Sequence, residues 1–112
     1  MDKQVRKGDA TLTGLAWYDE FQYARLLEAA VDAKSMPKTY DAWLKKCLMI
    51  EAEAVRAGAL ILRVYVDVGV LARWCIRNGR PNDGAARAAY AAEEVHRSGR
   101  AGITTNDPRG RR

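Results

Sequence analysis

The sequence predicts an α+β fold in which about four helices pack on one principal strand. The strand signal lies at 59–66, Ala-Leu-Ile-Leu-Arg-Val-Tyr-Val, where aliphatic and β-branched residues alternate as in a half-buried strand. The segments on both sides of it repeat apolar residues at helical spacing instead. A length of 112 residues, 48% hydrophobic and 29% charged, fits one soluble domain with a modest core.

Residues 1–14 are polar and lack helical periodicity, so we expect a flexible or extended arm before a single globular domain at 15–97. Thr11–Thr13 is the one part of this arm that could form a short β segment. Trp17 and Tyr18 are expected to fold back on the domain as a hydrophobic lid.

The first helix is predicted over residues 19–33. Asp19, followed three residues later by Gln22, is typical of a helix N-terminus, and apolar residues from Tyr23 to Val31 recur at helical spacing. Pro37 separates this helix from the next one, because proline disfavours helical geometry in the residue before it.

The second helix is predicted to begin at about Thr39, and Gly58 supplies the left-handed residue that often ends a helix. Met49 lies on its polar face, among Lys45, Glu53 and Arg56. We favour a tolerated single exposure for this methionine, and the alternative is the edge of a contact surface.

Within the strand at 59–66, the even-numbered side chains point to one face and the odd-numbered ones to the other. We expect the odd face, which carries Ile61, Arg63 and Tyr65, to be half covered. The predicted core combines the even face with residues of the neighbouring helices: Leu60, Leu62, Val64, Val66, Trp43, Leu44, Cys47, Leu71, Trp74 and Cys75.

A lone strand leaves its backbone groups unpaired, so the segment 59–66 needs a partner. The partner is either Thr11–Thr13 or the same strand of a second molecule, antiparallel across a two-fold axis. Because Thr11–Thr13 is short and weakly apolar, we favour the homodimer, in which Arg63 and Tyr65 meet their own copies.

Asp67 predicts the start of a short third helix, which ends at Asn78-Gly79. A fourth helix follows from residue 83 to about 97 and turns an alanine-rich face inward, made of Ala85, Ala88, Ala89, Ala92 and Val95. Residues 98–112 have no apolar stripe and predict a disordered basic tail.

The net charge of +5 is concentrated in two places, the tail and the segment 59–80. In that segment Arg63, Arg73, Arg77 and Arg80 face only Asp67 as a counter-charge. Such an excess is typical of a solvated face, and it also suits contacts with phosphates or an acidic partner, with Tyr65 available for stacking.

The residues that carry catalysis or bind cofactors do not form a recognisable pattern. His96 is the only histidine, Cys47 and Cys75 stand apart, and no glycine-rich loop joins a strand to a helix. We therefore expect no enzyme activity, no metal and no cofactor. Two cysteines at apolar positions, no apolar run of membrane-spanning length and no signal-peptide core predict a cytoplasmic protein with no membrane partner.

Four short motifs occur in a distinctive order: Trp17-Tyr18, Pro37-Lys38-Thr39-Tyr40-Asp41-Ala42-Trp43, Trp74-Cys75 and Ala86-Arg87-Ala88-Ala89-Tyr90. Over residues 17–95 the chain resembles a group of short, functionally uncharacterised bacterial proteins with Pro-x-Thr-Tyr-x-x-Trp, Trp-Cys and Ala-Arg-x-x-aromatic elements. The chain departs from that group at Leu48-Met49-Ile50, which is more apolar than the charged helix the resemblance implies. This difference favours an additional contact surface there.

These observations lead us to expect a small non-enzymatic binding or adaptor protein that docks a macromolecule, in a mobile-element or host-defence context. The alternative is a nucleic-acid-binding accessory protein that uses the basic 59–80 edge and the C-terminal tail. The residues expected to contact a protein partner or a nucleic acid are Arg63, Tyr65, Arg73, Arg77, Arg80 and Met49.

Overall fold

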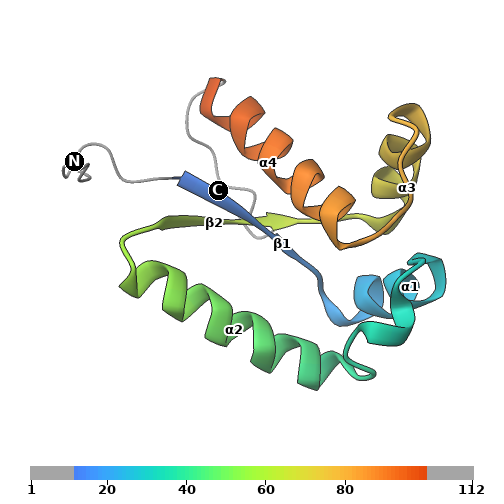
Figure 1. Cartoon of the computed structure of the whole chain (residues 1–112), viewed down its shortest axis with the longest axis horizontal. Helices are drawn as coiled ribbons and strands as arrows, with labels where there is room; N and C mark the ends of the chain where they lie inside the picture. Colours follow the sequence, from blue (N-terminus) through green and yellow to red (C-terminus); the bar gives the residue numbers. More distant parts are fainter. Residues whose placement is uncertain (1–11, 101–112) are drawn as a thin grey trace.

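The computed structural model describes residues 12–100 and confirms the α+β fold. Four α-helices and a short 3-10 helix accompany a sheet of two strands (Figure 1). In chain order the elements are β1 (Leu12–Trp17), α1 (Glu20–Ala29), η2 (Ala33–Ser35), α2 (Tyr40–Arg56), β2 (Leu60–Tyr65), α3 (Val68–Arg77) and α4 (Gly84–Arg100).

The partner of β2 is β1, which runs parallel to it from Leu12 opposite Leu60 to Trp17 opposite Tyr65. The N-terminal alternative is therefore realised within the chain, by a strand that is longer than the predicted Thr11–Thr13 and extends as far as Trp17. The arm predicted at 1–14 overlaps β1 from Leu12 onward, and its earlier residues lie outside the described part of the chain.

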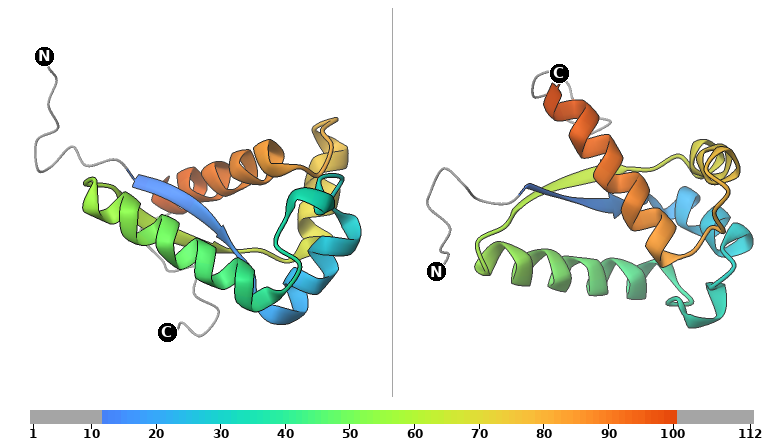
Figure 2. Two further views of the ribbon diagram at one scale, coloured as in Figure 1. Left: turned by 60° about the horizontal axis from the view of Figure 1, so that its bottom comes forward. Right: turned by 45° about the horizontal axis from the view of Figure 1, so that its top comes forward.

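The two strands form a thin central layer with a helix on each face. In Figures 1 and 2, α4 crosses one face of the sheet and α2 lies along the other. The segment that joins β1 to β2 contains α1, η2 and α2, as parallel strands require a crossover connection. Residues 98–100, predicted as part of a disordered tail, continue α4, and residues 101–112 lie outside the described chain.

Gly14 sets the close contact between β1 and α4. A Cβ atom added at Gly14 would lie 2.5 Å from Val95 Cγ2 and 2.7 Å from the backbone oxygen of Ala91. The prediction that α4 turns alanines inward is correct, but it names mostly the wrong alanines. Three of the predicted alanines are exposed, whereas the buried residues of this helix are Ala86, Arg87, Tyr90, Ala91 and Val95. Alanines occur on every side of α4, so their spacing alone does not identify the face that packs on the sheet.

Aromatic side chains fill the space between the sheet and α2. Trp43 is in edge-to-face contact with both Trp17 and Tyr18, with ring centroids 5.5 Å apart in each pair, and it stacks on Tyr23 at 5.3 Å. Trp17 and Tyr18 are thus part of the core itself and not a lid over it.

Most residues of the predicted core are buried, and the exceptions lie at its margins. Leu62 and Leu44 are partly buried against the core, but Leu60 is 55% exposed and its prediction as a core residue is wrong. Leu60 pairs with Leu12 at the open end of the sheet, where Leu12 is itself 45% exposed. The buried members of the predicted set are Val64, Val66, Trp43, Cys47, Leu71, Trp74 and Cys75.

The helix N-terminal caps follow the sequence closely. The side chains of Asp19, Thr39 and Asp67 accept hydrogen bonds from the backbone N–H three residues later, at 2.7, 3.1 and 3.1 Å. Gln22 departs from the capping-box expectation, because its side-chain oxygen accepts a hydrogen bond from Val68 N at 2.8 Å and so joins α1 to the start of α3.

A buried ion pair fixes the N-terminal end of α4 to the segment between α1 and η2. Arg87 is only 9% exposed, and its Nη2 lies 2.8 Å from Asp32 Oδ2. Its Nη1 donates to the side-chain and backbone oxygens of Asn82 at 3.0 and 3.1 Å. The hydrogen bond from Arg87 lowers the pKa of Asp32, so the carboxylate is ionised at neutral pH.

Candidate functional site

The six residues singled out from the sequence lie on three elements and the turn after α3. Arg63 and Tyr65 are half-buried on β2, and Met49 is exposed on the outer face of α2. Arg73, Arg77 and Arg80 are all exposed on α3 and the following turn. The six residues therefore do not form one site but divide between a surface around β2 and α2 and a surface around α3.

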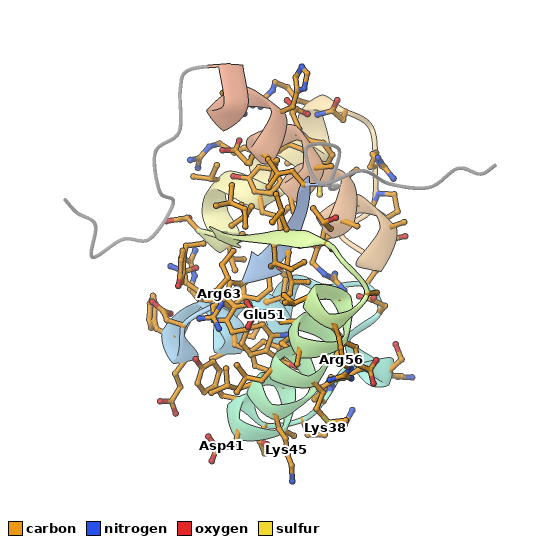
Figure 3. The ribbon with its side chains drawn as sticks, turned by 90° about the vertical axis from the view of Figure 1, so that its left-hand side faces the viewer. Lys38, Asp41, Lys45, Glu51, Arg56 and Arg63 are labelled. Carbon is orange, nitrogen blue, oxygen red and sulfur yellow. The ribbon has the colours of Figure 1, made fainter. Side chains whose placement is uncertain are left out.

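Arg63 is held by an internal partner that the sequence did not indicate. Its Nε and Nη2 lie 2.7 and 2.8 Å from the two carboxylate oxygens of Glu51 on α2, and its guanidinium carbon lies 3.9 Å from the centre of the Trp17 ring. Figure 3 shows Arg63 and Glu51 pointing toward each other between α2 and β2. This hydrogen bonding lowers the pKa of Glu51 and raises that of Arg63, so both groups stay charged and paired at neutral pH.

Replacing Glu51 with glutamine should lower the free energy of unfolding by about 1 kcal/mol, because the pair is bidentate but partly exposed to solvent. Chemical denaturation measures this change. Glu53→Gln is the matched control, since Glu53 is exposed on the same helix and forms no ion pair with a described residue. Equal stability of the two variants would show that the Arg63–Glu51 pair contributes nothing to the fold.

Within the part of the chain that the structure describes, the outer edge of β2 carries unpaired backbone groups. Val66 N–H donates to Trp17 O at 3.0 Å, and in a parallel ladder the backbone groups of successive residues point alternately to the two sides. The N–H groups of Ile61, Arg63 and Tyr65 therefore point away from β1. Among residues 12–100, no strand other than β1 pairs with β2.

Exposed apolar side chains border this edge. Val55, Leu60 and Ile61 line a shallow hollow of about 530 Å³ between the C-terminal half of α2 and the start of β2. Leu48 lies two helical turns before Val55 on the same side of α2, and both are about half exposed. We call this the β2-edge surface, and define it as the outer edge of β2 with Leu48, Val55, Leu60 and Ile61.

Met49 lies farther around α2, on the outer face of the helix. Its side chain is 59% exposed, and Lys45 precedes it by one turn of the helix. In Figure 3, Lys45 and Arg56 both lie on the outward side of α2, away from the Arg63–Glu51 pair. Glu53 follows Met49 by one turn, so the charges near Met49 are two cations and one carboxylate. This excess of positive charge is suited to a partner that presents apolar groups beside carboxylates.

A second surface consists of arginines on and around α3. Arg73, Arg77 and Arg80 form no ion pair with any residue in the described range 12–100. Arg25 on α1 joins them, because a Cβ atom at Gly69 would lie 3.6 Å from Arg25 Nη2 and 3.9 Å from Arg73 Nη1, with Asp67 Oδ1 nearer at 3.2 Å. The sequence did not indicate Arg25, since only folding brings α1 beside α3. We call Arg25, Arg73, Arg77 and Arg80 the basic surface.

Of the aromatic residues near the basic surface, Trp74 is already engaged in the fold, whereas Phe21, beside Arg25, is exposed. Trp74 is buried, and its Nε1 donates to Glu93 Oε1 at 3.0 Å. The Arg80 guanidinium carbon lies 5.9 Å from the centre of the Trp74 ring. A nucleic acid on this surface would therefore contact arginines rather than stack on the tryptophan.

The thiols have little nucleophilic character. Cys47 and Cys75 are both buried and unbridged, and burial raises the pKa of Cys47 to about 11 and also raises that of Cys75. Each thiol is therefore protonated at neutral pH. Within the described residues, no three His, Cys, Asp or Glu side chains lie close enough together to hold a metal ion, and no helix is long and apolar enough to cross a bilayer.

Comparisons with other proteins leave the geometry as the only guide to function. No protein-family model matches the chain, and neither the curated proteins nor the solved structures gave a significant match. The resemblance of residues 17–95 to a group of short bacterial proteins thus stays a prediction.

Proposed function

We propose that the chain is a non-enzymatic adaptor protein that works as a homodimer, joined through the β2-edge surface, and docks a protein partner through the outer face of α2. The observation that carries this proposal is the outer edge of β2, which pairs with no strand other than β1 among residues 12–100 and is bordered by exposed apolar side chains. An open edge of this kind is a template for another strand. The two buried, unbridged cysteines favour a cytoplasmic location.

The sequence of β2 is complementary to itself when two copies run antiparallel about Arg63. Ile61 then lies opposite Tyr65 of the second copy, and Leu62 lies opposite Val64 of the second copy. Each of these pairs joins two apolar or aromatic side chains. The outward N–H groups of Ile61, Arg63 and Tyr65 gain carbonyl partners at the same time.

Arg63 meets its own copy at the centre of this arrangement, and Glu51 removes the repulsion that two bare arginines would create. The two α2 helices could also pack against each other in this dimer. Strands lie about 4.8 Å apart, so two α2 helices related across a four-stranded sheet would be about 10 Å apart. That distance is close to the 8–10 Å of packed helices, and the contact would cover Leu48 and Val55.

Ile61→Lys should abolish the dimer and leave a folded monomer, because a lysine on a strand edge opposes pairing with another strand. Sedimentation velocity gives the mass, and circular dichroism checks the fold. Thr13→Lys is the matched control, since Thr13 pairs with Ile61 in the β1–β2 register but lies on the other strand. Dimerisation that survives Ile61→Lys would rule out the β2 edge as the contact.

The partner of the α2 face is expected to be a protein segment with apolar and acidic side chains, which would contact Met49 beside Lys45. Met49→Asp should remove this partner from material that co-purifies with the chain from its native cell. Phe21→Asp, at a 68% exposed position on α1, should retain it. Loss with both variants, or with neither, would contradict docking at Met49.

Nucleic-acid binding is the second candidate, and the four arginines of the basic surface, which have no ion-pair partners among the described residues, favour it. Phosphate contacts predict an affinity for duplex DNA that falls steeply with salt, with a log–log slope of about −0.9 for each phosphate neutralised. The triple variant R73E/R77E/R80E should then lose binding, whereas Met49→Asp should not. Binding that is insensitive to salt would exclude this candidate.

A further inference from the structure

A second cavity lies on the opposite side of the sheet from the β2 edge. Its volume is about 390 Å³, which is within the range of about 300–1,000 Å³ typical of small-molecule sites. Its walls come mainly from β1, α2 and α4, with Leu26 of α1, Ser35 of η2 and residues 36–37 completing them, and β2 does not contribute. β1 lies between α2 and α4 in Figure 2, so the cleft follows the outer edge of β1.

Most of the cleft is apolar. Leu15 on β1, Trp43 and Ile50 on α2 and Ala88 on α4 all line it. Since Trp17 O accepts from β2, the alternation of the ladder turns the backbone groups of Gly14 and Ala16 away from β2 and toward this side. The cleft therefore combines apolar walls with backbone donors and acceptors along one edge.

One end of the cleft is polar and incompletely satisfied. Tyr18, Asp32 and Arg87 all line it. Asp32 Oδ2 accepts from Arg87 Nη2 at 2.8 Å and from Gly84 N at 3.1 Å, but the buried Oδ1 has no hydrogen-bond partner among the described residues. The hydroxyl of Tyr18, a residue only 3% exposed, has none either. Buried polar atoms nearly always have a partner, so two such atoms at one end of a cleft point to a ligand.

The charges at this end determine which ligand group can bind there. Arg87 and Asp32 neutralise each other, so a charged ligand group would find no unpaired counter-charge at this end. The other charged residue that lines the cleft is Lys46 of α2, which is exposed. Burial raises the pKa of Tyr18, so its hydroxyl keeps its proton and can donate. Asp32 Oδ1 can only accept, because Arg87 keeps the carboxyl ionised. A matching group offers an acceptor beside a donor and carries no charge.

We propose that this cleft binds a small uncharged molecule with an apolar body and an amide-like polar end. The apolar body lies against Trp43, Leu15 and Ile50. The amide-like end donates to Asp32 Oδ1 and accepts from the Tyr18 hydroxyl. The site is separate from the β2-edge surface, so it stands whether or not the chain dimerises.

The test uses benzamide as the probe, with toluene and benzoate as controls of similar size that lack the polar end or carry a charge. Nuclear magnetic resonance titrations of the labelled full chain should show saturable shifts at residues 14–16 and at the Trp43 indole with benzamide. Benzamide should bind at least about fivefold more tightly than either control, the difference expected of one buried hydrogen bond.

Two variants, each with a matched control, locate the site. Tyr18→Phe should weaken benzamide about fivefold without loss of stability, because the hydroxyl has no partner to lose among the described residues. Tyr90→Phe, at a buried tyrosine that does not line the cleft, should leave binding unchanged. Ala88→Leu, at an exposed position on the cleft wall, should block binding, whereas Ala92→Leu on the same helix should not.

Several results would overturn the proposal. Absence of saturable shifts with all three probes would show that the cleft is not a binding site. Equal affinity for toluene and benzamide, or tighter binding of benzoate, would show that the ligand class is wrong. Unchanged benzamide affinity in Tyr18→Phe would show that the polar end does not contact the ligand.

Discussion

Replacing Arg87 with methionine should lower the free energy of unfolding by about 3 kcal/mol or more. The variant keeps an unbranched side chain similar to the aliphatic part of arginine but removes both the charge and the donors. Asp32 then loses its counter-ion, and the oxygens of Asn82 lose both of their bonds to Arg87 Nη1. Breaking a largely buried pair by removing one member costs about 3–5 kcal/mol, and the partial exposure of Asp32 places this variant near the lower end.

Chemical denaturation measures this loss, and Arg97→Met provides the matched control. Arg97 lies on the same helix and pairs with Glu93 and Glu94, but its side chain is 57% exposed. An exposed pair of this kind contributes only about 0–1 kcal/mol. If the two variants were equally stable, the Asp32–Arg87 pair would not be what holds α4 to the loop before η2.

The Asp32–Arg87 pair also makes the free energy of unfolding depend on pH. Because Arg87 lowers the pKa of Asp32 in the folded state, the stabilisation is complete above the unfolded value of about 4 and is lost as the pH falls through the folded value. Arg87→Met should flatten this part of the stability profile, whereas Arg97→Met should leave it in place. An unchanged acid profile in Arg87→Met would mean that Asp32 is not the group that titrates.

Replacing Gly14 with alanine should lower the free energy of unfolding by about 2–3 kcal/mol. The new methyl group would lie 2.5 Å from Val95 Cγ2, a side-chain atom, and 2.7 Å from Ala91 O, which cannot move without the helix. Overpacking of this kind typically costs about 1–3 kcal/mol, and the backbone contact places it at the upper end. Thermal and chemical unfolding both measure the change.

Gly84→Ala is the control for this substitution. Gly84 begins α4, and its nearest neighbour to an added Cβ atom is Asp32 Oδ2 at 3.7 Å, an ordinary contact. Alanine also favours the helix more than glycine does, so this variant should be neutral or slightly stabilising. A Gly14→Ala variant as stable as Gly84→Ala would contradict the close approach of β1 and α4.

The sequence predicted those features that neighbouring residues determine. Asp19, Thr39 and Asp67 each cap a helix within three residues, and Gly58 and Gly79 adopt positive φ angles of 103° and 62° after helices. These signals are local, so they can be recognised without knowledge of the fold.

The register and full length of β1 could not be predicted in the same way. Gly14 and Ala16 have little tendency to form strands, and they are suited to β1 only because α4 packs so closely against it. The strand and its helix are separated by most of the chain. The residue propensities therefore predict a flexible arm at this position, whereas packing against α4 stabilises a strand.

The charged pairs were missed for a related reason. Glu51 and Arg63 lie 12 residues apart on a helix and a strand, and Asp32 and Arg87 lie 55 residues apart. One signal was present for each pair: Glu51 interrupts the apolar stripe of α2, and Arg87 is a single cation near the start of an alanine-rich helix. A charge at an inward position predicts a partner but does not identify it.

The central claim is that a second copy of the chain pairs with the outer edge of β2, and amide hydrogen exchange at micromolar concentration tests it most directly. The N–H groups of Leu62 and Val64 point toward β1 and should exchange slowly in any case. A dimer predicts that Ile61, Arg63 and Tyr65 are also protected and that the mass is twice the 12.5 kDa of one chain. Rapid exchange at Ile61, Arg63 and Tyr65 beside slow exchange at Leu62 and Val64, with a monomeric mass, would contradict the claim.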